Sequence, residues 1–329
     1  GKMPKPQSFY GGDLQGVLDK LPYLQELGVS GIYLTPIFQS PSNHKYDTTD
    51  YRKVDEMFGS KELLCKLVQQ AHAAGIRVVL DGVFNHSCWS FAPFQDVLER
   101  GGQSPYKDWF HIDSFPAGRF TEEEAHDYTK PLDSSRLNYH VFGTSPSMPK
   151  LNTENPELEK YLLDTVSMWT RDTGIDGWRL DVSDEVNHGF WRDFRKTVKA
   201  INPEALIIGE NWHNAYPWLQ GDQFDSVMNY SFTKSCIQFF AQREVDAEQF
   251  AGDLSSYLMR NSEQVDFAML NLLDSHDTVR FLTWCGGDKR LLRMAVLLLF
   301  SYVGMPCIYY GSEIGMEGGG DPDCRRTFD

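Results

Sequence analysis

Residues 60–83 read SKELLCKLVQQAHAAGIRVVLDGV and contain the unit from which the rest of the chain is built. Ser60 is a residue type that caps helix N-termini, and Gly75 is a residue type that ends helices. Between them, apolar residues recur at helical spacing. They are Leu63, Leu64, Leu67, Val68 and Ala71. Residues 77–83 are then a short apolar run rich in β-branched residues, which predicts a buried strand.

The same unit recurs along the chain. Asn155-Pro156 opens a second amphipathic helix that runs to Gly174. Strands that alternate with helices predict an α/β protein with a parallel sheet, here a parallel (β/α)8 TIM barrel. Seven runs are predicted strands, one short of the eight that close such a barrel. They are Gly31–Ile37, Arg77–Val83, Gly177–Val182, Leu206–Asn211, Phe224–Tyr230, Ala268–Ser275 and Met305–Tyr310.

The segment 85–153 interrupts this alternation. It is poor in periodic pattern and rich in Gly, Pro, Ser and aromatic residues. A connection of this length inside a compact domain is usually functional. We therefore predict residues 1–84 as the first part of the barrel, residues 85–153 as an inserted lobe and residues 154–329 as the second part. The acidic run Glu122 to Glu124 in the lobe is interpreted as a solvated face.

Composition excludes several classes of function. The formal net charge is -15, from 46 acidic and 31 basic residues, which argues against a nucleic-acid partner. No apolar run approaches the roughly 20 residues that span a bilayer, and residues 1–7 lack a secretory signal, so we expect a cytoplasmic protein without a membrane partner. The six cysteines show no CxxC pair. We interpret them as reduced thiols and assign no metal ligand.

Polar residues follow several of the predicted strands at the point where each strand ends. In parallel barrels such positions carry the reacting groups. The four segments are Asp81-Gly-Val-Phe-Asn85-His86, Arg179-Leu-Asp181, Gly209-Glu210-Asn211-Trp212 and Asp274-Ser-His276-Asp277. Acids, an arginine and histidines are thereby predicted to share one rim of the barrel.

This set suits cleavage of a glycosidic bond, which needs one carboxylate at the anomeric carbon and one carboxyl group that protonates the leaving oxygen. Arg179 lies two residues from Asp181 and so on the same strand face, where it favours an ionised, oriented carboxylate. Trp212 shares the strand parity of Glu210 and offers a sugar a flat surface. Any single one of these acids would also suit a structural ion pair.

These segments closely resemble the alpha-amylase family, glycoside hydrolase family 13, over nearly the whole chain. The resemblance implies Asp181 as the nucleophile, Glu210 as the general acid/base and Asp277 as a third acid that grips the distorted sugar. Arg179, His86, His276 and Trp212 are implied as substrate-binding residues. The segment 85–153 corresponds to the family's domain B, which follows its third barrel strand.

Two loops extend the resemblance. Ser42-Asn-His-Lys-Tyr46-Asp47 resembles the family segment whose tyrosine stacks on the sugar at the cleavage site. Asp321-Pro-Asp-Cys-Arg325 resembles a late loop that contacts the non-reducing side of the substrate. The family requires no cofactor, although the position of Asn85 belongs to a calcium site in some members, so a structural calcium ion is also compatible.

Met148-Pro-Lys-Leu-Asn152 resembles the tag of the neopullulanase, cyclomaltodextrinase and maltogenic amylase branch. The resemblance implies an α-1,4-glucan hydrolase that acts on cyclomaltodextrins, pullulan, starch and maltooligosaccharides through a covalent glycosyl-enzyme. A parent protein of this branch is often a homodimer. Residues 182–188 depart from the branch pattern at Ser183, Asp184 and Asn187, which leaves a glucanotransferase as an alternative.

Other interpretations remain. An inactive amylase-like partner protein would typically have lost one of the three acids, all of which are present. A metal enzyme that uses His44, His86, Asp81 and Asp277 finds no supporting ligand spacing. The family's first strand normally lies just upstream of Tyr10-Gly-Gly-Asp-Leu, which only nine residues precede here. We therefore expect the first barrel strand and the family's N- and C-terminal β domains to be absent.

Overall fold

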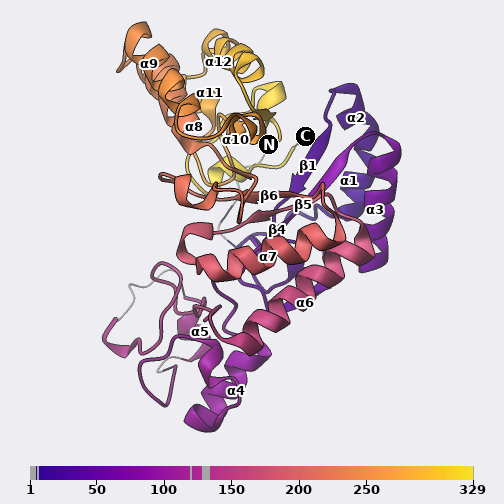
Figure 1. Cartoon of the computed structure of the whole chain (residues 1–329), viewed down its shortest axis with the longest axis vertical. Helices are drawn as coiled ribbons and strands as arrows, with labels where there is room; N and C mark the ends of the chain where they lie inside the picture. The colour runs from indigo at the N-terminus through magenta and orange to yellow at the C-terminus, as the bar shows by residue number, and fades with distance from the viewer. Residues whose placement is uncertain (1–4, 6, 119–120, 128–133, 329) are drawn as a thin grey trace. The chain divides into compact units, whose positions relative to one another are not determined.

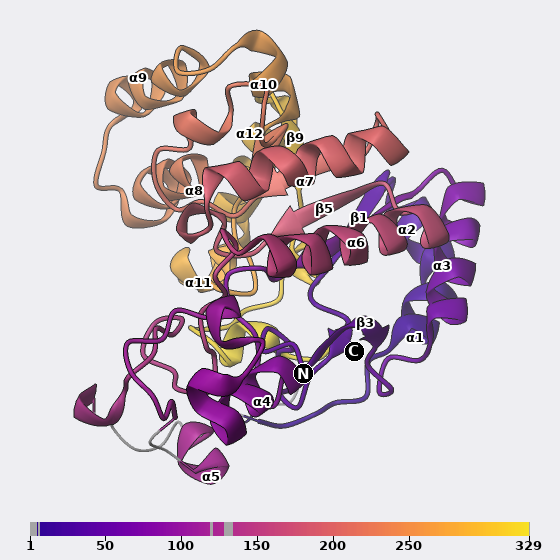
Figure 2. The same ribbon diagram turned by 60° about the horizontal axis from the view of Figure 1, so that its bottom comes forward.

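The computed structural model describes residues 5, 7–118, 121–127 and 134–328, shown in Figures 1 and 2. These residues divide into two compact units. The N-terminal unit is Gly11–Ile207, and the C-terminal unit is formed by the described residues of 1–10 and 208–329. Each unit is treated by itself below.

The N-terminal unit contains the predicted parallel strands. β1 (Gly31–Leu34) pairs with β4 (Arg77–Gly82), and β4 pairs with β5 (Gly177–Leu180), all in parallel. β6 (Leu206–Gly209) comes next in the sheet, and the division between the units falls within it. The carboxyl ends of β4 and β5 therefore lie at the same edge, as the sequence predicted.

Helices pack around this sheet in an unbroken series, in which α1 contacts α3, α3 contacts α6 and α6 contacts α7 (Figure 1). Their bounds are α1 Leu14–Asp19, α2 Leu21–Glu26, α3 Lys61–Ala73, α6 Pro156–Thr173 and α7 His188–Ile201. The predicted caps are confirmed. The Ser60 side chain accepts from the Leu63 N–H, Asn155 caps α6, and Gly174 ends α6 with φ +70°.

The segment 85–153 contains short elements, of which α4 is a helix that sequence periodicity did not reveal. Phe94 and Val97 of α4 are buried, and Pro93 lies in its first turn, where proline is tolerated. The antiparallel pair of β2 and β3, before this segment, was also not predicted. The bounds are β2 Phe38–Gln39, β3 Asp50–Val54, α4 Ala92–Arg100, α5 Glu122–Ala125, and the 3₁₀ turns η1 Gly101–Gln103, η2 Lys107–Trp109, η3 Ser134–Arg136 and η4 Ser183–Glu185.

The C-terminal unit continues the parallel pairing. The end of β6 pairs with β7 (Ser226–Val227), a parallel bridge joins Met228 to Leu270, and β8 (Leu270–Leu272) pairs with β9 (Met305–Cys307). Each of the seven predicted runs therefore contains a parallel strand, and the fold is consistent with a TIM barrel.

Every predicted run is longer than the strand it contains, and two of the runs extend into helices, because Tyr230 begins α8 and Ala268 ends α10. The helices of this unit are α8 Tyr230–Cys236, α9 Ala247–Leu258, α10 Glu263–Ala268, α11 Phe281–Trp284 and α12 Lys289–Ser301. Shorter elements are η5 Tyr216–Trp218, the π-helix η6 Ile237–Gln242, η7 Ser312–Ile314 and η8 Asp323–Arg325.

Apolar side chains fill both units. In the N-terminal unit, Phe84 lies in an aromatic cluster with Trp178, Phe190, Trp191 and Phe194. In the C-terminal unit, buried residues from η6 and from helices α8, α9, α11 and α12 form one cluster. None of the helices within the described residues combines the length and apolar character needed to cross a bilayer.

Candidate active site

Arg179 joins two carboxylates at the ends of β4 and β5 in the N-terminal unit. Its Nη1 donates to Asp181 Oδ1 at 2.8 Å and to Asp81 Oδ2 at 3.0 Å. All three side chains are buried, and Arg179 is fully so. A guanidinium between two carboxylates favours their ionised forms and fixes their orientation. The Asp181 carboxylate is therefore held in one orientation beside a cation.

The register of the two strands produces this contact. Asp81 lies opposite Arg179 in the β4–β5 pair, and Asp181 follows Arg179 by two residues, on the same face. The chain turns immediately afterwards, where Val182 adopts a left-handed conformation with φ +45°. This conformation is strained for a β-branched residue, and such strain collects at functional sites.

Arg179→Met is expected to lower the free energy of unfolding by about 3–5 kcal/mol, because it leaves two buried carboxylates without a cation. Urea denaturation followed by circular dichroism measures the change. Arg290→Met is the control, since Arg290 pairs with Asp288 on the surface and its removal is expected to change nothing measurable. Equal stability of the Arg179→Met variant and the unmodified protein would contradict a charge-holding role.

Tyr46 and His86 lie beside this carboxylate group. The Tyr46 hydroxyl donates to Asp81 Oδ2 at 3.1 Å. Burial, and next the Asp81 carboxylate, raise the pKa of Tyr46 well above its usual value, so the hydroxyl keeps its proton as a donor. His86 Nε2 donates to the Tyr46 carbonyl at 3.1 Å, and its ring stacks on Phe142. His86 therefore also positions Tyr46.

His86 is expected to make stability fall as the pH is lowered. Burial lowers its pKa from 6.5 to about 3, so the folded state resists a proton that the unfolded chain accepts. The free energy of unfolding accordingly falls below pH 6.5. It is lower by about 2 kcal/mol at pH 5 and continues to fall until about pH 3. A His86→Gln variant lacks this contribution. Denaturation of both proteins between pH 7 and pH 5 measures the difference, and parallel curves would contradict the depressed pKa.

The surroundings of Asn85 do not fit a calcium ion. Lys150 Nζ donates to Asn85 Oδ1 at 2.7 Å and contacts Glu185 Oε2 at 3.1 Å. The ammonium group thus occupies the amide oxygen of Asn85 that a calcium ion at this position would need. Lys150 belongs to the Met148–Asn152 tag quoted above, so the tag itself supplies the cation at this position.

Glu210 follows β6 in the C-terminal unit and is buried. The Trp212 indole N–H donates to Glu210 Oε1 at 3.1 Å. One face of that indole lies on Tyr230, with ring centroids 3.7 Å apart and planes 7° apart, while 45% of Trp212 remains exposed. Stacking on Tyr230 therefore fixes the orientation of the Trp212 ring. The Trp212 N–H in turn orients the carboxyl group of Glu210, the candidate general acid.

A second group in this unit surrounds Asp277. His276 Nε2 lies 2.9 Å from Asp277 Oδ2, and Arg325 Nη2 donates to Asp277 Oδ1 at 3.2 Å. Arg325 Nε also contacts Asp321 Oδ1 at 3.0 Å. The structure thus brings together two segments that were predicted separately, His276-Asp277 and the loop with Asp321 and Arg325.

Sequence reasoning missed two residues that support these groups. Tyr230 stacks on Trp212, and its hydroxyl lies 3.2 Å from Ser275 Oγ, which in turn accepts from the Asp277 N–H. Arg280 is fully buried and donates to the Cys324 and Tyr310 carbonyls, so it holds the loop that carries Arg325. Two features of the sequence could have indicated these residues. Tyr230 is an aromatic residue shortly after β7, and Arg280 is an arginine three residues beyond the Asp274–Asp277 motif.

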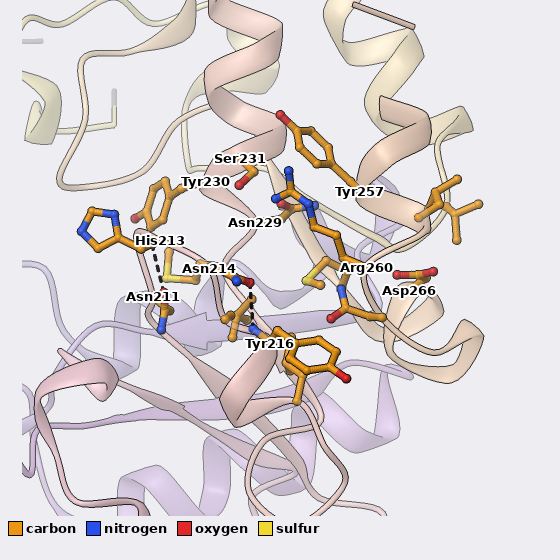
Figure 3. A pocket seen from close by; sticks show the side chains of 18 of the residues that line it. Asn211, His213, Asn214, Tyr216, Asn229, Tyr230, Ser231, Tyr257, Arg260 and Asp266 are labelled. Carbon is orange, nitrogen blue, oxygen red and sulfur yellow. Dashed lines mark hydrogen bonds between the residues drawn. The ribbon is translucent and has the colours of Figure 1, made fainter. Parts of the chain in front are cut away.

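A pocket that is open to solvent also lies in the C-terminal unit (Figure 3). Its lining includes Asn211, Tyr216, Tyr257 and Arg260 but not Glu210. Neighbouring residues at a strand end point to opposite faces, so Asn211 can line this pocket while Glu210 does not. Glu210 and Asp277 are therefore not among the residues that line this pocket.

Comparison with known proteins identifies the family. The family model of the alpha-amylase catalytic domain matches residues 4–324. The chain belongs to the alpha-amylase family. Within that family it is similar to a cyclomaltodextrinase of Geobacillus thermopakistaniensis and to neopullulanase 2 of Thermoactinomyces vulgaris, at 54% identity to each. Both matches cover 99% of this chain and 53% of the relative.

A solved structure of a cyclomaltodextrinase has the same fold. It is 51% identical to this chain and superposes with a TM-score of 0.93, over 99% of this chain and 54% of the other. The chain therefore spans about half the length of these alpha-amylase family relatives. Their names describe enzymes that act on cyclomaltodextrins and on pullulan.

Proposed function

We propose that this protein cleaves α-1,4-glucosidic bonds of cyclomaltodextrins, pullulan, starch and maltooligosaccharides, with retention at the anomeric carbon. The observation that carries the proposal is the Asp81–Arg179–Asp181 group, which holds one buried carboxylate in one orientation beside a cation. A carboxylate held in this way suits a nucleophile. Similarity to enzymes that open cyclomaltodextrins supports the class of substrate.

The proposed reaction has two steps. The Asp181 carboxylate attacks the anomeric carbon while Glu210 gives its proton to the leaving oxygen, which forms a covalent glycosyl-enzyme. Glu210, now a carboxylate, then takes a proton from a water molecule that attacks the same carbon and releases Asp181. Two inversions give net retention.

The remaining residues would bind and distort the sugar. Asp277, held by His276 and Arg325, would accept hydrogen bonds from sugar hydroxyls in the transition state. Tyr46 and the exposed face of Trp212 offer aromatic surfaces for sugar rings. Asp321 would contact the substrate from the loop 321–325, and its ion pair with Arg325 would hold its side chain in place.

Product analysis tests this function. The protein is incubated with β-cyclodextrin, pullulan and starch, and products are separated by chromatography. Maltose from β-cyclodextrin and panose from pullulan are expected. NMR spectra should be recorded during the first turnovers, before mutarotation mixes the anomers. The products should then be in the α-anomeric form, because the mechanism retains the configuration. Initial β-anomers would exclude the covalent mechanism.

The same assay separates hydrolysis from glycosyl transfer, because an acceptor sugar competes with water for the glycosyl-enzyme. With glucose in large excess, a hydrolase still releases mainly maltose, whereas a glucanotransferase produces longer maltooligosaccharides. Failure of all three substrates to react would overturn the proposed function.

A further inference from the structure

Three side chains with metal-binding atoms that have no role in the proposed reaction converge in the N-terminal unit. Asp47 lies before β3, Cys88 lies after β4, and His126 directly follows α5, which Figures 1 and 2 label. Cys88 Sγ is 3.8 Å from Asp47 Oδ2 and 4.0 Å from His126 Nε2, and all three atoms lie within 4.8 Å of one another. Thiolate, imidazole and carboxylate are the ligand types that Zn²⁺ binds.

The spacing is close to that of a tetrahedral site. Zinc–ligand bonds of about 2.0–2.3 Å place neighbouring ligand atoms about 3.5 Å apart. The separations of Cys88 Sγ from Asp47 Oδ2 and from His126 Nε2, 3.8 and 4.0 Å, exceed this by a few tenths of an ångström. Because the His126 side chain is partly exposed, it can rotate toward the other two ligands. Three protein ligands leave a fourth position for a water molecule.

Each ligand is already oriented by a neighbour. The His126 Nδ1–H donates to the Glu122 carbonyl at 2.9 Å, which leaves the lone pair of Nε2 on the side of Cys88. Ser40 and Ser42 both donate hydroxyl hydrogen bonds to Asp47 Oδ1, so Oδ2 is the oxygen that faces Cys88.

The backbone holds these segments together independently of any ion. The Cys88 N–H donates to the Thr48 carbonyl at 2.9 Å. Ser90 Oγ donates to Glu122 Oε1 at 2.9 Å, which ties α5 to the segment after β4. The Ser90 N–H also approaches Cys88 Sγ at 3.5 Å, as a donor to a metal-bound thiolate would. The ligand set is therefore preorganised.

Charge points in the same direction. Asp47 and Cys88 are fully buried, and within the described part of the chain no lysine or arginine contacts Asp47. A buried carboxylate without a cation is costly. A divalent cation would neutralise both Asp47 and the Cys88 thiolate.

We propose that Asp47, Cys88 and His126 form a binding site for Zn²⁺ or a similar thiophilic divalent cation. Binding forms one bond each from the metal to Asp47 Oδ2, Cys88 Sγ and His126 Nε2, and the thiol proton passes to solvent. Asp47 adjoins Tyr46 and Cys88 lies two residues after His86, so the ion would clamp the two segments that carry these substrate-binding candidates. Its role is structural and is independent of the proposed function.

The site is tested by titrating the chelator-treated protein with Co²⁺ and then with Zn²⁺. Co²⁺ is expected to bind once per chain and to produce the charge-transfer absorption of a cobalt–thiolate bond, which Zn²⁺ should displace. Cys88→Ser should abolish that absorption. His126→Gln and Asp47→Asn should each weaken the Zn²⁺ affinity measured by calorimetry at least tenfold. The control is Cys236→Ser, which alters a buried cysteine of the C-terminal unit and should change neither the cobalt–thiolate absorption nor the Zn²⁺ affinity.

Circular dichroism confirms that each variant is folded. If Cys88→Ser does not fold, His126→Gln still decides, because its side chain lies partly at the surface. Zn²⁺ should raise the Tm of the unmodified protein and leave that of His126→Gln unchanged. Absence of the cobalt–thiolate absorption in the unmodified protein, its persistence in Cys88→Ser, or equal Zn²⁺ affinity in His126→Gln would overturn the proposal.

Discussion

Asp181→Ala is expected to lower kcat on β-cyclodextrin by about four orders of magnitude or more, because removal of a nucleophile leaves only binding and transition-state contacts. Asp181 is buried and lies 2.8 Å from the Arg179 guanidinium, so its loss also removes a charge partner of Arg179. Initial rates of maltose release measure the effect.

Azide distinguishes a nucleophile from a structural acid. Azide can enter the space vacated in Asp181→Ala and attack the anomeric carbon once, from the nucleophile's face. With β-cyclodextrin this opens the ring, and β-maltoheptaosyl azide should form at an increased rate. The control is Asp164→Asn, which alters an exposed residue of α6 paired with Lys160, and it should retain full activity. An Asp181→Ala variant that keeps a tenth of the activity would exclude the assigned nucleophile.

Glu210→Gln is expected to lower kcat on β-cyclodextrin by about 10²–10⁴-fold, the usual contribution of general acid catalysis. The glutamine retains an oxygen that can accept from the Trp212 indole N–H, so the local packing is preserved. A poor leaving group needs the proton of Glu210, whereas fluoride departs without one. The first step with α-maltosyl fluoride should therefore be affected far less than cleavage of β-cyclodextrin.

Rapid-quench kinetics with both substrates measures this difference. Glu204→Gln, in the exposed turn before β6, is the matched control and should behave as the unmodified protein. Equal losses on the two substrates would show that Glu210 acts through structure instead of proton transfer.

Local pattern was enough to predict the elements that build the fold. Residues 60–83 carry a helix cap, an apolar stripe and a β-branched run, and α3 and β4 follow within a residue or two of those signals. The helix from Pro156 to Thr173 is equally explicit. Such signals depend on neighbours a few positions apart, which the sequence lists directly.

Short elements were missed or misplaced. α4 has only nine residues, so its apolar spacing at Phe94, Val97 and Leu98 covers little more than one turn, and Phe94 packs against Trp89 and Phe110. β7 spans only Ser226–Val227 within a longer apolar run. Burial against distant side chains decided these lengths, and periodicity does not report such contacts.

Some contacts of the candidate site could also be predicted from the sequence. Strand parity predicted that Arg179 pairs with Asp181, and the structure joins these two side chains. The contact of Arg179 with Asp81 was not predicted and comes from the register of β4 and β5. The prediction that Glu210 and Trp212 share a strand face is consistent with their hydrogen bond. The catalytic roles of Asp181, Glu210 and Asp277 stay predictions for the experiments above.

The sequence by itself determined the alternation of helices and strands, the family and the residue types at the strand ends, because these depend on local order along the chain. Only the tertiary structure decided that Lys150 neutralises Asn85, that Tyr230 supports Trp212, and that Asp47, Cys88 and His126 face one another. Those contacts join residues 18 to 79 positions apart, as for Tyr230 with Trp212 and for His126 with Asp47. Chain folding, and not any local motif, brings such residues within a few ångströms.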